Sequence, residues 1–505
     1  MTNQLFNNWL SKKSEKKMSR KIRILIKVNI IFMILLIPSI GIINLASAAQ
    51  ISSIIAYSPD GKGYIEELSS GKQLIHMEGS PYEMGYQQGY LDPISVERLA
   101  SVDWFKNVVL NLLEAEDWIL LFIMKKVLNY NRLMSEVGSV VDEPTIAAVA
   151  AQSTDNLDML LDKLFILCHE LVAYNSIYVP QEFLDEIQGV ADGATDAGHP
   201  VSYEEVLLLN MGMDALLALA YPVVEPYLFW MDLFSFLSCS GYVAQGAATT
   251  DGHTIMGRHW QFTSYVTHEE MILMEYCPDS GNQFLSTSCA GFVGVTSAMN
   301  DQGLGIGNDM VPAQDCNPAN FGMGTLLTAR YVMQYTNQLS EAINFITTHT
   351  RGCSWIYGIG DGRNGETGGV ALETSTNYYR VRDMTYTRPW WAIFSFNTIE
   401  KKSDLVTYTN HYIYYRMNDL ADSTAIDDSV DRYTWLTNLA LDMYGTLDLD
   451  SGSVLIDYLH PPNYGYYGSD LTQPVGCAVT CWDLTTLEAK ALFGYYNDDW
   501  VYRSL

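Results

Sequence analysis

The sequence is poor in cysteine, in basic residues and in long apolar runs, and each shortage excludes a class of protein. Eight cysteines in 505 residues are too few for a small scaffold held together by disulfides. Only 29 lysines and arginines oppose 58 aspartates and glutamates, and the net charge of −29 repels nucleic-acid phosphates and anionic lipids. After residue 50, no apolar run is long enough to predict a polytopic membrane protein.

The N-terminal segment departs from this acidic composition. Eight lysines and arginines between Lys12 and Lys27 precede an apolar run over residues 28–46, and residues 46–48 form an Ala-Ser-Ala cleavage site. This pattern predicts a signal peptide over residues 1–48 and a secreted or extracytoplasmic protein. An uncleaved signal anchor is the alternative, because the run approaches the length that spans a bilayer. The remaining chain has 21 basic and 57 acidic residues, a net charge of −36.

The rest of the chain predicts an α+β protein in which the predicted secondary structure changes from mainly helix to mainly strand at Cys239. Residues 51–100 indicate short strands and a helix start, and residues 101–236 have helical periodicity. From Cys239 onward, short alternating segments and Asp-Gly turns predict antiparallel sheet, with helices over residues 326–350 and 432–444. Runs of strands between runs of helices are typical of layered α+β folds. The expected regions are therefore a leader (1–48), a mainly helical region (49–238) and a sheet-rich region (239–505).

Two cysteines near the C-terminus raise the question of a metal site. Cys477 and Cys481 lie four residues apart in a strand-like run, so we expect them to share one face. No His-x-His or Cys-x-x-Cys pair accompanies them. Buried thiols or one disulfide are favoured over zinc.

Cys239 is the candidate nucleophile. Residues 238–241 read Ser-Cys-Ser-Gly, so small neighbours leave the backbone of Cys239 accessible. A hairpin through Asp251-Gly252 would return Arg258 to the start of the strand, where its guanidinium would favour thiolate over thiol. From these residues alone, a packed thiol is the favoured interpretation of Cys239, and a surface cation is the alternative for Arg258.

The pattern Cys-Ser-x-x-x-Ala-x-Gly-x-Ala-Thr-x-Asp-Gly-x-x-x-x-Gly-Arg, which starts at Cys239, resembles the opening of the mature chain in N-terminal nucleophile (Ntn) hydrolases. It is most similar to the acyl-coenzyme A:6-aminopenicillanic-acid acyltransferase-like family, which is related to choloylglycine hydrolase, acid ceramidase and phospholipase B-like proteins. Further segments resemble the family in the same order: GSPYEMGYQQG (79–89), VPQEFLDEIQGVADGA (179–194), MNDQGLGIGNDM (299–310), LSEAINFI (339–346), TNHYIYYRM (409–417) and DSVDRYTWL (428–436).

The resemblance implies a fold and a mechanism. The fold is a four-layer αββα sandwich with an N-terminal helical segment, in which residues 49–238 are the propeptide or α chain and residues 239–505 the catalytic β chain. The precursor cleaves itself between Ser238 and Cys239, and the released α-amino group of Cys239 becomes the general base. Its pKa of roughly 7.7 to 8.0 lies just below that of a thiol, so proton transfer is nearly balanced.

Further site residues follow from the matched motifs. Asn308 is the expected oxyanion donor, with a turn-forming asparagine as the alternative. Arg258 is expected to hold the substrate carbonyl or the thiolate. Arg432 is expected to support the site from a helix, with a plain helix salt bridge as the alternative.

The chain departs from its relatives at two places. Relatives read Gly-Arg-Asn-x-Asp where this chain has Gln261 as the last residue, so a carboxylate is replaced by a neutral amide. Relatives also carry an asparagine in the strand where Trp355 and Ile356 stand here. These changes leave open a binding protein that kept the fold and lost turnover.

Weaker patterns have simpler readings. Residues 360–365 satisfy Gly-x-Gly-x-x-Gly, but a strand follows instead of a helix, so a hairpin turn is favoured over a dinucleotide site. His259 is expected to point away from Arg258, and His411 is expected to be structural or to order a loop. The aromatic segment over residues 462–468 is either an acyl or sugar pocket or a surface loop.

The sequence thus predicts a self-cleaving cysteine hydrolase or acyltransferase that acts on linear amides or related acyl bonds through a Cys239 thioester. A phospholipase B-like esterase is the alternative within the same class. The implied chemistry requires no metal or organic cofactor. The expected partners are a small acyl-amide or acyl-ester substrate and, in a homodimer, a second copy of the chain. No nucleic acid is expected, and a membrane only through an uncleaved N-terminal segment.

Overall fold

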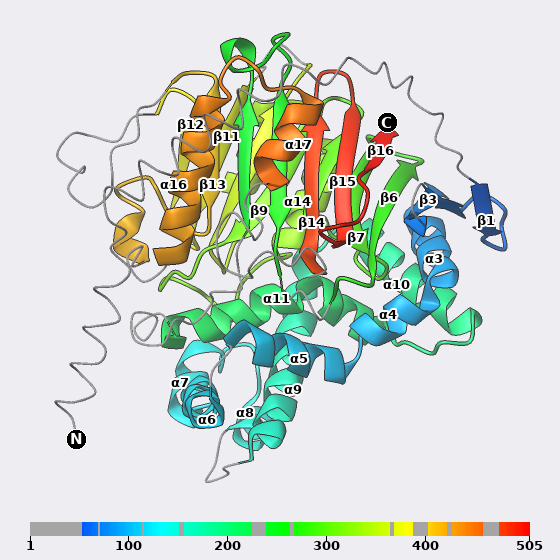
Figure 1. Ribbon diagram of the computed structural model, residues 1–505. Helices are drawn as coiled ribbons and strands as arrows, with labels where there is room; N and C mark the ends of the chain where they lie inside the picture. Colours follow the sequence, from blue (N-terminus) through cyan, green and yellow to red (C-terminus); the bar gives the residue numbers. More distant parts are fainter. Residues whose placement is uncertain are drawn as a thin grey trace. The chain divides into compact units, whose positions relative to one another are not determined.

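The strands form two sheets that pack against each other (Figure 1). The structure is a computed structural model that describes residues 53–68, 71–113, 116–150, 156–224, 239–262, 267–363, 368–386, 402–421, 427–457 and 474–505. Helices cover the outer face of each sheet, which gives the order helix, sheet, sheet, helix. The α+β class and the four-layer sandwich predicted from the sequence are confirmed.

The larger sheet has ten strands and is antiparallel except where β3 and β6 run parallel. The N-terminal region supplies its first three strands, so this sheet joins the two regions that were separated at Cys239 from the sequence. In spatial order the strands are β1 (Ser53–Tyr57), β2 (Tyr64–Glu67), β3 (Gln73–Gly79), β6 (Met271–Pro278), β7 (Phe284–Cys289), β8 (Ser297–Asn300), β9 (Leu304–Met310), β10 (Trp355–Asp361), β11 (Gly368–Thr374) and β12 (Tyr379–Asp383).

The smaller sheet has six antiparallel strands. Its centre is the predicted hairpin of β4 and β5, joined through the turn at Asp251 and Gly252. The strands in spatial order are β13 (Leu405–Thr409), β4 (Ser240–Ala244), β5 (Ile255–Trp260), β14 (Pro474–Asp483), β15 (Glu488–Tyr495) and β16 (Val501–Ser504).

Helices pack on both outer faces, so central strands such as β5 and β9 are buried along their whole length. The larger sheet is covered by α3 (Pro81–Leu91), α14 (Thr325–Tyr335) and α15 (Leu339–Thr348). The smaller sheet is covered by α16 (Asp427–Asp442) and α17 (Leu449–Asp457).

The pairing of α3 with α10 (Gln181–Asp196) explains two glycine-containing motifs of the sequence. A β-carbon at Gly85 would lie 2.0 Å from the Glu186 carbonyl oxygen, and one at Gly189 would lie 2.2 Å from the Tyr82 carbonyl oxygen. Only glycine permits the two helix backbones to approach so closely. These motifs therefore encode a helix contact.

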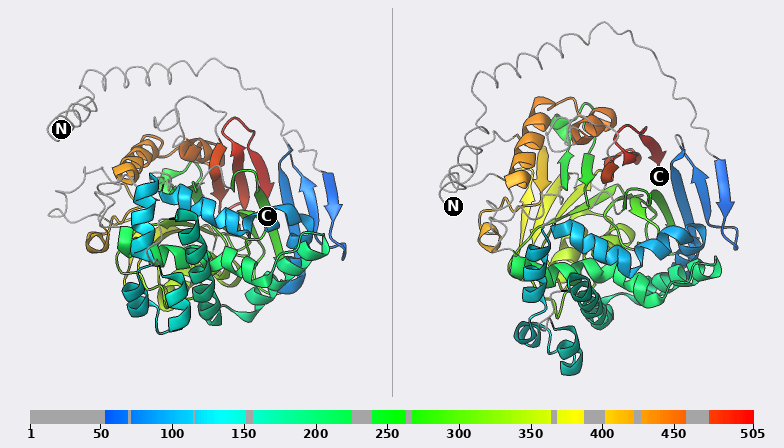
Figure 2. Two further views of the ribbon diagram at one scale, coloured as in Figure 1. Left: turned by 90° about the horizontal axis from the view of Figure 1, so that it is seen from below. Right: turned by 60° about the horizontal axis from the view of Figure 1, so that its bottom comes forward.

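The other helices lie together at one end of the sandwich (Figures 1 and 2). They are α4 (Pro93–Leu99), α5 (Val102–Leu113), α6 (Asp117–Val127), α7 (Tyr130–Glu136), α8 (Glu143–Val149), α9 (Leu157–Asn175) and α11 (Tyr203–Val224). Of the described helices, α11 alone is long and apolar enough to span a membrane, but 83% of its most apolar window is buried inside the protein. It is therefore a core helix by burial.

The sequence predicted the helix starts well. Ser80 and Glu83 form a capping box at the start of α3, with Pro81 as the first helical residue. Ser202 and Glu205 exchange the same pair of hydrogen bonds before α11.

The prediction that Cys477 and Cys481 share a face was wrong. The register of β14 shifts between Pro474 and Ala478, so Cys477 packs in the large core and Cys481 in the core beneath α17. Sγ of Cys477 lies 3.1 Å from Oγ1 of Thr267, whereas Sγ of Cys481 lies 3.7 Å from the Tyr242 hydroxyl. All eight cysteines are free thiols, and the described residues contain no cluster of three metal-ligating side chains.

Three predictions lie outside the described residues: the leader over residues 1–48, the scissile residue Ser238 and the aromatic segment over residues 462–468. The division of the chain at Cys239 into two processed regions also stays a prediction.

Candidate active site

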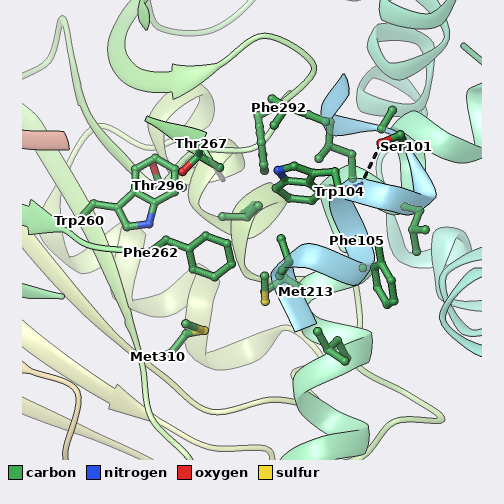
Figure 3. A pocket seen from close by; sticks show the side chains of 18 of the residues that line it. Ser101, Trp104, Phe105, Met213, Trp260, Phe262, Thr267, Phe292, Thr296 and Met310 are labelled. Atoms are coloured by element: carbon green, nitrogen blue, oxygen red, sulfur yellow. Dashed lines mark hydrogen bonds between the residues drawn. The ribbon is translucent and has the colours of Figure 1, made fainter. Parts of the chain in front are cut away.

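A pocket of about 890 Å³, counting its open mouth, lies between the helical end of the molecule and the edges of the two sheets. One wall comes from α4, α5 and α11, and the opposite wall from the residues around β5, β9 and β10. Figure 3 shows Trp104, Phe262, Phe292 and Met213 gathered around the space. Because both regions of the chain contribute, the helical region forms part of the site.

The lining of the pocket is predominantly apolar. Large aromatic side chains contribute from both walls, namely Trp104, Phe105, Phe165, Trp260, Phe262, Phe292 and Trp355. The charged side chain in the lining is Glu205, whose carboxylate already accepts hydrogen bonds from the backbone and hydroxyl of Ser202. Such a lining favours an uncharged, apolar ligand group.

Cys239 lies in the wall of this pocket, directly before β4. The side chain is 3% exposed, and Sγ lies 3.5 Å from the backbone oxygen of Gln261. The β4–β5 hairpin creates this contact, because Ser240 pairs with His259 and the next residues outward face each other. The predicted return of the hairpin to the candidate nucleophile is thus confirmed.

Arg432 holds the backbone of Cys239 from the opposite side. Its Nη1 donates to the Cys239 carbonyl oxygen at 2.6 Å and to Oγ of Ser240 at 2.8 Å, while Nη2 donates to Oδ1 of Asn410 at 3.1 Å. Asn410 is anchored in turn by its donation to the Met310 carbonyl at 2.9 Å. The guanidinium therefore fixes the peptide group between Cys239 and Ser240.

Arg258 is fully buried and lies between the two sheets, so the surface-cation alternative is wrong. Its Nε donates to Oδ1 of Asp309 at 3.1 Å, and Nη2 forms an ion pair with the same oxygen at 2.9 Å. Nη1 donates to the Thr296 carbonyl at 2.8 Å. Nη2 also donates to the Asn308 carbonyl. Gly307 leaves room for this side chain, because a β-carbon there would lie 2.2 Å from Cδ of Arg258.

Asn308 lies within β9, so the alternative of a turn-forming asparagine is wrong. It lines the pocket together with Cys239, and its Nδ2 donates to the Val295 carbonyl at 3.4 Å. The structure thus brings all four predicted site residues, Cys239, Arg258, Asn308 and Arg432, to one region. Their roles in chemistry remain predictions.

The charged side chains around Cys239 have opposite effects on the pKa of its thiol. Burial raises the pKa of the Cys239 thiol above its ordinary value and Asp309 raises it further, while Arg258 and Arg432 lower it. Burial also raises the pKa of Asp309 to about 6, although Arg258 pulls it down. Burial disfavours the charge on Arg258, but Asp309 more than compensates, so its pKa lies above the ordinary value.

The two departures from the family pattern have defined places. Gln261 is buried beside Gly476, where a β-carbon would lie 2.4 Å from Cγ of Gln261. Trp355 lines the pocket, and its Nε1 donates to Oδ1 of the buried Asp214 at 3.1 Å. Ile356 is buried and carries no hydrogen-bonding side chain. Neither Trp355 nor Ile356 therefore offers the side-chain amide donor that the resemblance led us to expect in this strand.

Three weaker predictions can also be judged. His259 points away from Arg258, toward the hydroxyl of Tyr496 at 3.3 Å. Nδ1 of His411 lies 2.8 Å from Oγ of Ser429, so His411 connects the loop after β13 with α16. The Gly-x-Gly-x-x-Gly segment joins the antiparallel strands β10 and β11, which confirms the hairpin.

Sequence reasoning missed Asp309, Asn410 and Asp214. Asp309 had a usable signal: it stands in an otherwise apolar and glycine-rich strand, where a buried carboxylate needs a cationic partner. Asn410 lies inside the matched segment over residues 409–417, but only its neighbour His411 was considered as a possible site residue. The wall from α4 and α5 had no signal, because its apolar residues read as ordinary helix core.

Comparisons with known proteins agree with the family resemblance found in the sequence. Residues 248–459 match the model of the family described as acyl-coenzyme A:6-aminopenicillanic acid acyl-transferase. An uncharacterized protein of Archaeoglobus fulgidus is 43% identical over 448 residues, which cover 88% of this chain and 68% of that protein. The chain belongs to the acyl-transferase family.

The chain also has weaker similarities to other known proteins. Protein dcd1A of Dictyostelium discoideum is 25% identical over 218 residues, which cover 41% of this chain and 43% of that protein. Penicillin V acylase from Agrobacterium tumefaciens is 12% identical with a TM-score of 0.36, over 53% of this chain and 86% of the acylase. The Caenorhabditis elegans ortholog of N-acylethanolamine-hydrolyzing acid amidase is 13% identical with a TM-score of 0.33, over 49% of this chain and 93% of that protein.

Family membership points to an acyl-amide hydrolase or acyltransferase of the Ntn kind.

Proposed function

We propose that the chain is a self-cleaving Ntn hydrolase or acyltransferase that uses Cys239 as its nucleophile. One observation carries this proposal: Cys239 lies in the wall of the apolar pocket, next to two buried arginines, and directly precedes a central strand. Arg432 binds its carbonyl group, and Arg258 partly offsets the rise that burial causes in the pKa of its thiol. This arrangement suits a residue whose backbone and sulfur take part in chemistry.

The first step is an acyl shift within the precursor. The thiol of Cys239 attacks the carbonyl carbon of Ser238, the new C–S bond replaces the C–N bond of the peptide, and the thiol proton passes to the released nitrogen. Water then hydrolyses the thioester, which leaves a carboxylate on Ser238 and a free thiol and α-amine on Cys239. The α-amine gives the mature site a base close to its own nucleophile.

Turnover uses the same atoms with an external substrate. The α-amine takes the thiol proton while sulfur attacks the substrate carbonyl, and it then gives that proton to the leaving amine. A thioester remains on Cys239, and water or an acceptor amine releases the acyl group. Asn308 is the side-chain amide beside the pocket that can serve the developing oxyanion.

The pocket supports a substrate with a bulky apolar acyl group on a linear amide. Its aromatic walls provide burial for such a group, and its described lining contains no lysine or arginine that would bind an anionic head group. Release of p-nitroaniline from dodecanoyl-p-nitroanilide is the assay we expect to succeed. Fatty-acid release from phosphatidylcholine vesicles with no anilide turnover would instead indicate the phospholipase B-like esterase.

Intact-mass measurement of the purified protein tests the cleavage. We expect two fragments from the parent, divided between Ser238 and Cys239, and one uncut chain from Cys239→Ala. Cys168→Ala is the matched control, because Cys168 is an equally buried thiol in α9 and should leave the cleavage unchanged. The mass of the N-terminal fragment also reports whether the predicted leader over residues 1–48 has been removed.

Two results would count against the proposal. A parent chain that turns over substrate without a break at residue 239 has no α-amine there and needs another base. Cleavage that persists in Cys239→Ala would show that another group attacks the backbone.

A further inference from the structure

In the buried ion pair of Arg258 and Asp309, the arginine uses all of its nitrogens as hydrogen-bond donors, but one oxygen of the aspartate has no donor within the part of the chain that the structure describes. Every nitrogen of Arg258 donates a hydrogen bond, to Oδ1 of Asp309 and to the carbonyls of Thr296 and Asn308. Asp309 has no exposed surface, and its second oxygen, Oδ2, accepts no hydrogen bond from the described residues. A buried carboxylate oxygen without a donor is costly, and such atoms require an explanation.

The charge balance around Cys239 supplies the explanation. The ionisable groups that act on this site are Arg258 on β5, Asp309 on β9, Arg432 on α16, Tyr408 on β13 and Cys477 on β14. Two of these groups are cations, and Asp309 is the carboxylate among the groups that influence the pKa of Cys239. Glu205 lines the same pocket but its carboxylate accepts from Ser202, and Asp214 accepts from Trp355. Cleavage before Cys239 would create an ammonium group in this buried environment, and a buried ammonium requires a nearby anion.

Position 261 does not provide that anion. Gln261 is neutral, whereas the resemblance described under Sequence analysis led us to expect a carboxylate at this position. Its contribution to the site is a backbone oxygen 3.5 Å from Sγ of Cys239. A carboxylate on the facing sheet does lie next to Arg258. Strand β5 packs against β9, and the Arg258 side chain donates a hydrogen bond to Asp309 across the two sheets.

We infer that Asp309 is a positioning residue that replaces the carboxylate missing at position 261: Oδ1 orients Arg258, and Oδ2 receives the α-ammonium group released at Cys239. The inference rests on the proposed function, since the ammonium exists only after cleavage. It explains why one oxygen of the Asp309 carboxylate is buried without a hydrogen-bond donor among the residues described. It also means that Gln261 need not abolish activity.

The pH dependence of the mature enzyme tests this inference. A nearby anion favours the charged amine, so Asp309→Asn should lower the pKa of the amine and move the acid limb of kcat/KM for dodecanoyl-p-nitroanilide down by about one pH unit or more. Asp309→Glu keeps the negative charge, so the acid limb of its kcat/KM profile should lie at the same pH as in the parent enzyme. Glu186→Gln is the matched control, because Glu186 forms a buried pair with Arg330 elsewhere. It should leave the limb in place.

A second readout does not depend on turnover. The pH midpoint for alkylation of Cys239 by iodoacetamide should also move down in Asp309→Asn, because Arg258 then acts unopposed on the thiol. An unchanged midpoint and limb in a cleaved Asp309→Asn enzyme would overturn the inference, as would an equal shift in Glu186→Gln. An uncut but active parent would instead contradict the proposed function itself.

Gln261→Asp tests the same point if Asp309→Asn does not fold. This variant keeps the pair of Arg258 and Asp309 and adds a carboxylate at the position used by relatives. If Asp309 already supplies the counter-charge, a second anion should lower kcat/KM severalfold. A rise in kcat/KM would show that the parent site lacks a carboxylate, and the inference would be wrong.

Discussion

At the scale of single residues, the site depends on charged side chains that are buried away from solvent. Arg258, Asp309 and Arg432 are at most 2% exposed, and the two arginines use their donors on Asp309, on Asn410, on the Ser240 hydroxyl and on backbone carbonyls. Removing one member of a buried pair leaves the other uncompensated, whereas removing both can be nearly neutral. The arrangement is thus sensitive to single substitutions in a way that a surface ion pair is not.

Arg258→Met should lower the free energy of unfolding by about 3 to 5 kcal/mol, because Asp309 would remain buried without its partner. The double variant Arg258→Met/Asp309→Leu should recover most of this loss. Urea unfolding in the uncut Cys239→Ala background measures both. Equal stability of the single and double variants would contradict the assignment of a tightly coupled pair.

Asp214 gives a pH prediction of defined sign. Burial raises its pKa from 3.8 to about 6, so the folded state binds this proton more tightly than the unfolded state. The resulting stabilisation is present below pH 4 and is lost as the pH rises through 6. Relative to Asp214→Asn, the parent should lose up to about 3 kcal/mol between pH 4 and pH 7. A stability difference between the two proteins that does not vary with pH would contradict this.

At the scale of elements, the sequence predicted local structure better than the contacts between distant segments. The hairpin of β4 and β5 and the capped start of α3 follow from turn residues and caps, which act over a few positions. The single helix expected over residues 326–350 was wrong, because the chain forms α14 and α15 with a break after Tyr335. The contact of Arg258 with Asp309 joins residues in different sheets, and no periodicity encodes it. The shift in β14 was missed for a similar reason, because its cause lies in packing against neighbouring strands.

The crossing of α3 and α10 predicts a large effect from one methyl group. Gly189→Ala would place a β-carbon 2.2 Å from the Tyr82 carbonyl oxygen, so the helices would have to separate. We expect a loss of about 1 to 3 kcal/mol in urea unfolding. Gly212→Ala is the control, since its β-carbon would meet only the flexible side chain of Leu208 within α11. A Gly189→Ala protein as stable as the control would contradict the close crossing.

At the scale of the whole molecule, the regions before and after Cys239 form one body. Strand β3 pairs in parallel with β6, Arg503 contacts both Glu66 and Glu275, and α11 lines the pocket beside Cys239. The short strands expected over residues 51–100 are β1 to β3, and they extend the larger sheet. A pocket built from both regions requires that both remain after cleavage.

The two fragments of the cleaved protein should therefore stay associated. We expect them to elute together in size-exclusion chromatography in native buffer and to separate in 6 M guanidinium chloride, since a shared sheet and core must unfold before they part. Loss of the N-terminal fragment under native conditions, with activity retained, would show that the helical wall is not part of the working site.

The most direct test of the account is to identify the residue that becomes acylated. The purified enzyme is mixed with the p-nitrophenyl ester of dodecanoic acid, quenched with acid after a few seconds, digested and mapped by mass spectrometry. The account predicts a dodecanoyl group on a peptide whose first residue is Cys239. An acyl group on any other residue, or on a peptide that continues upstream through Ser238, would contradict it.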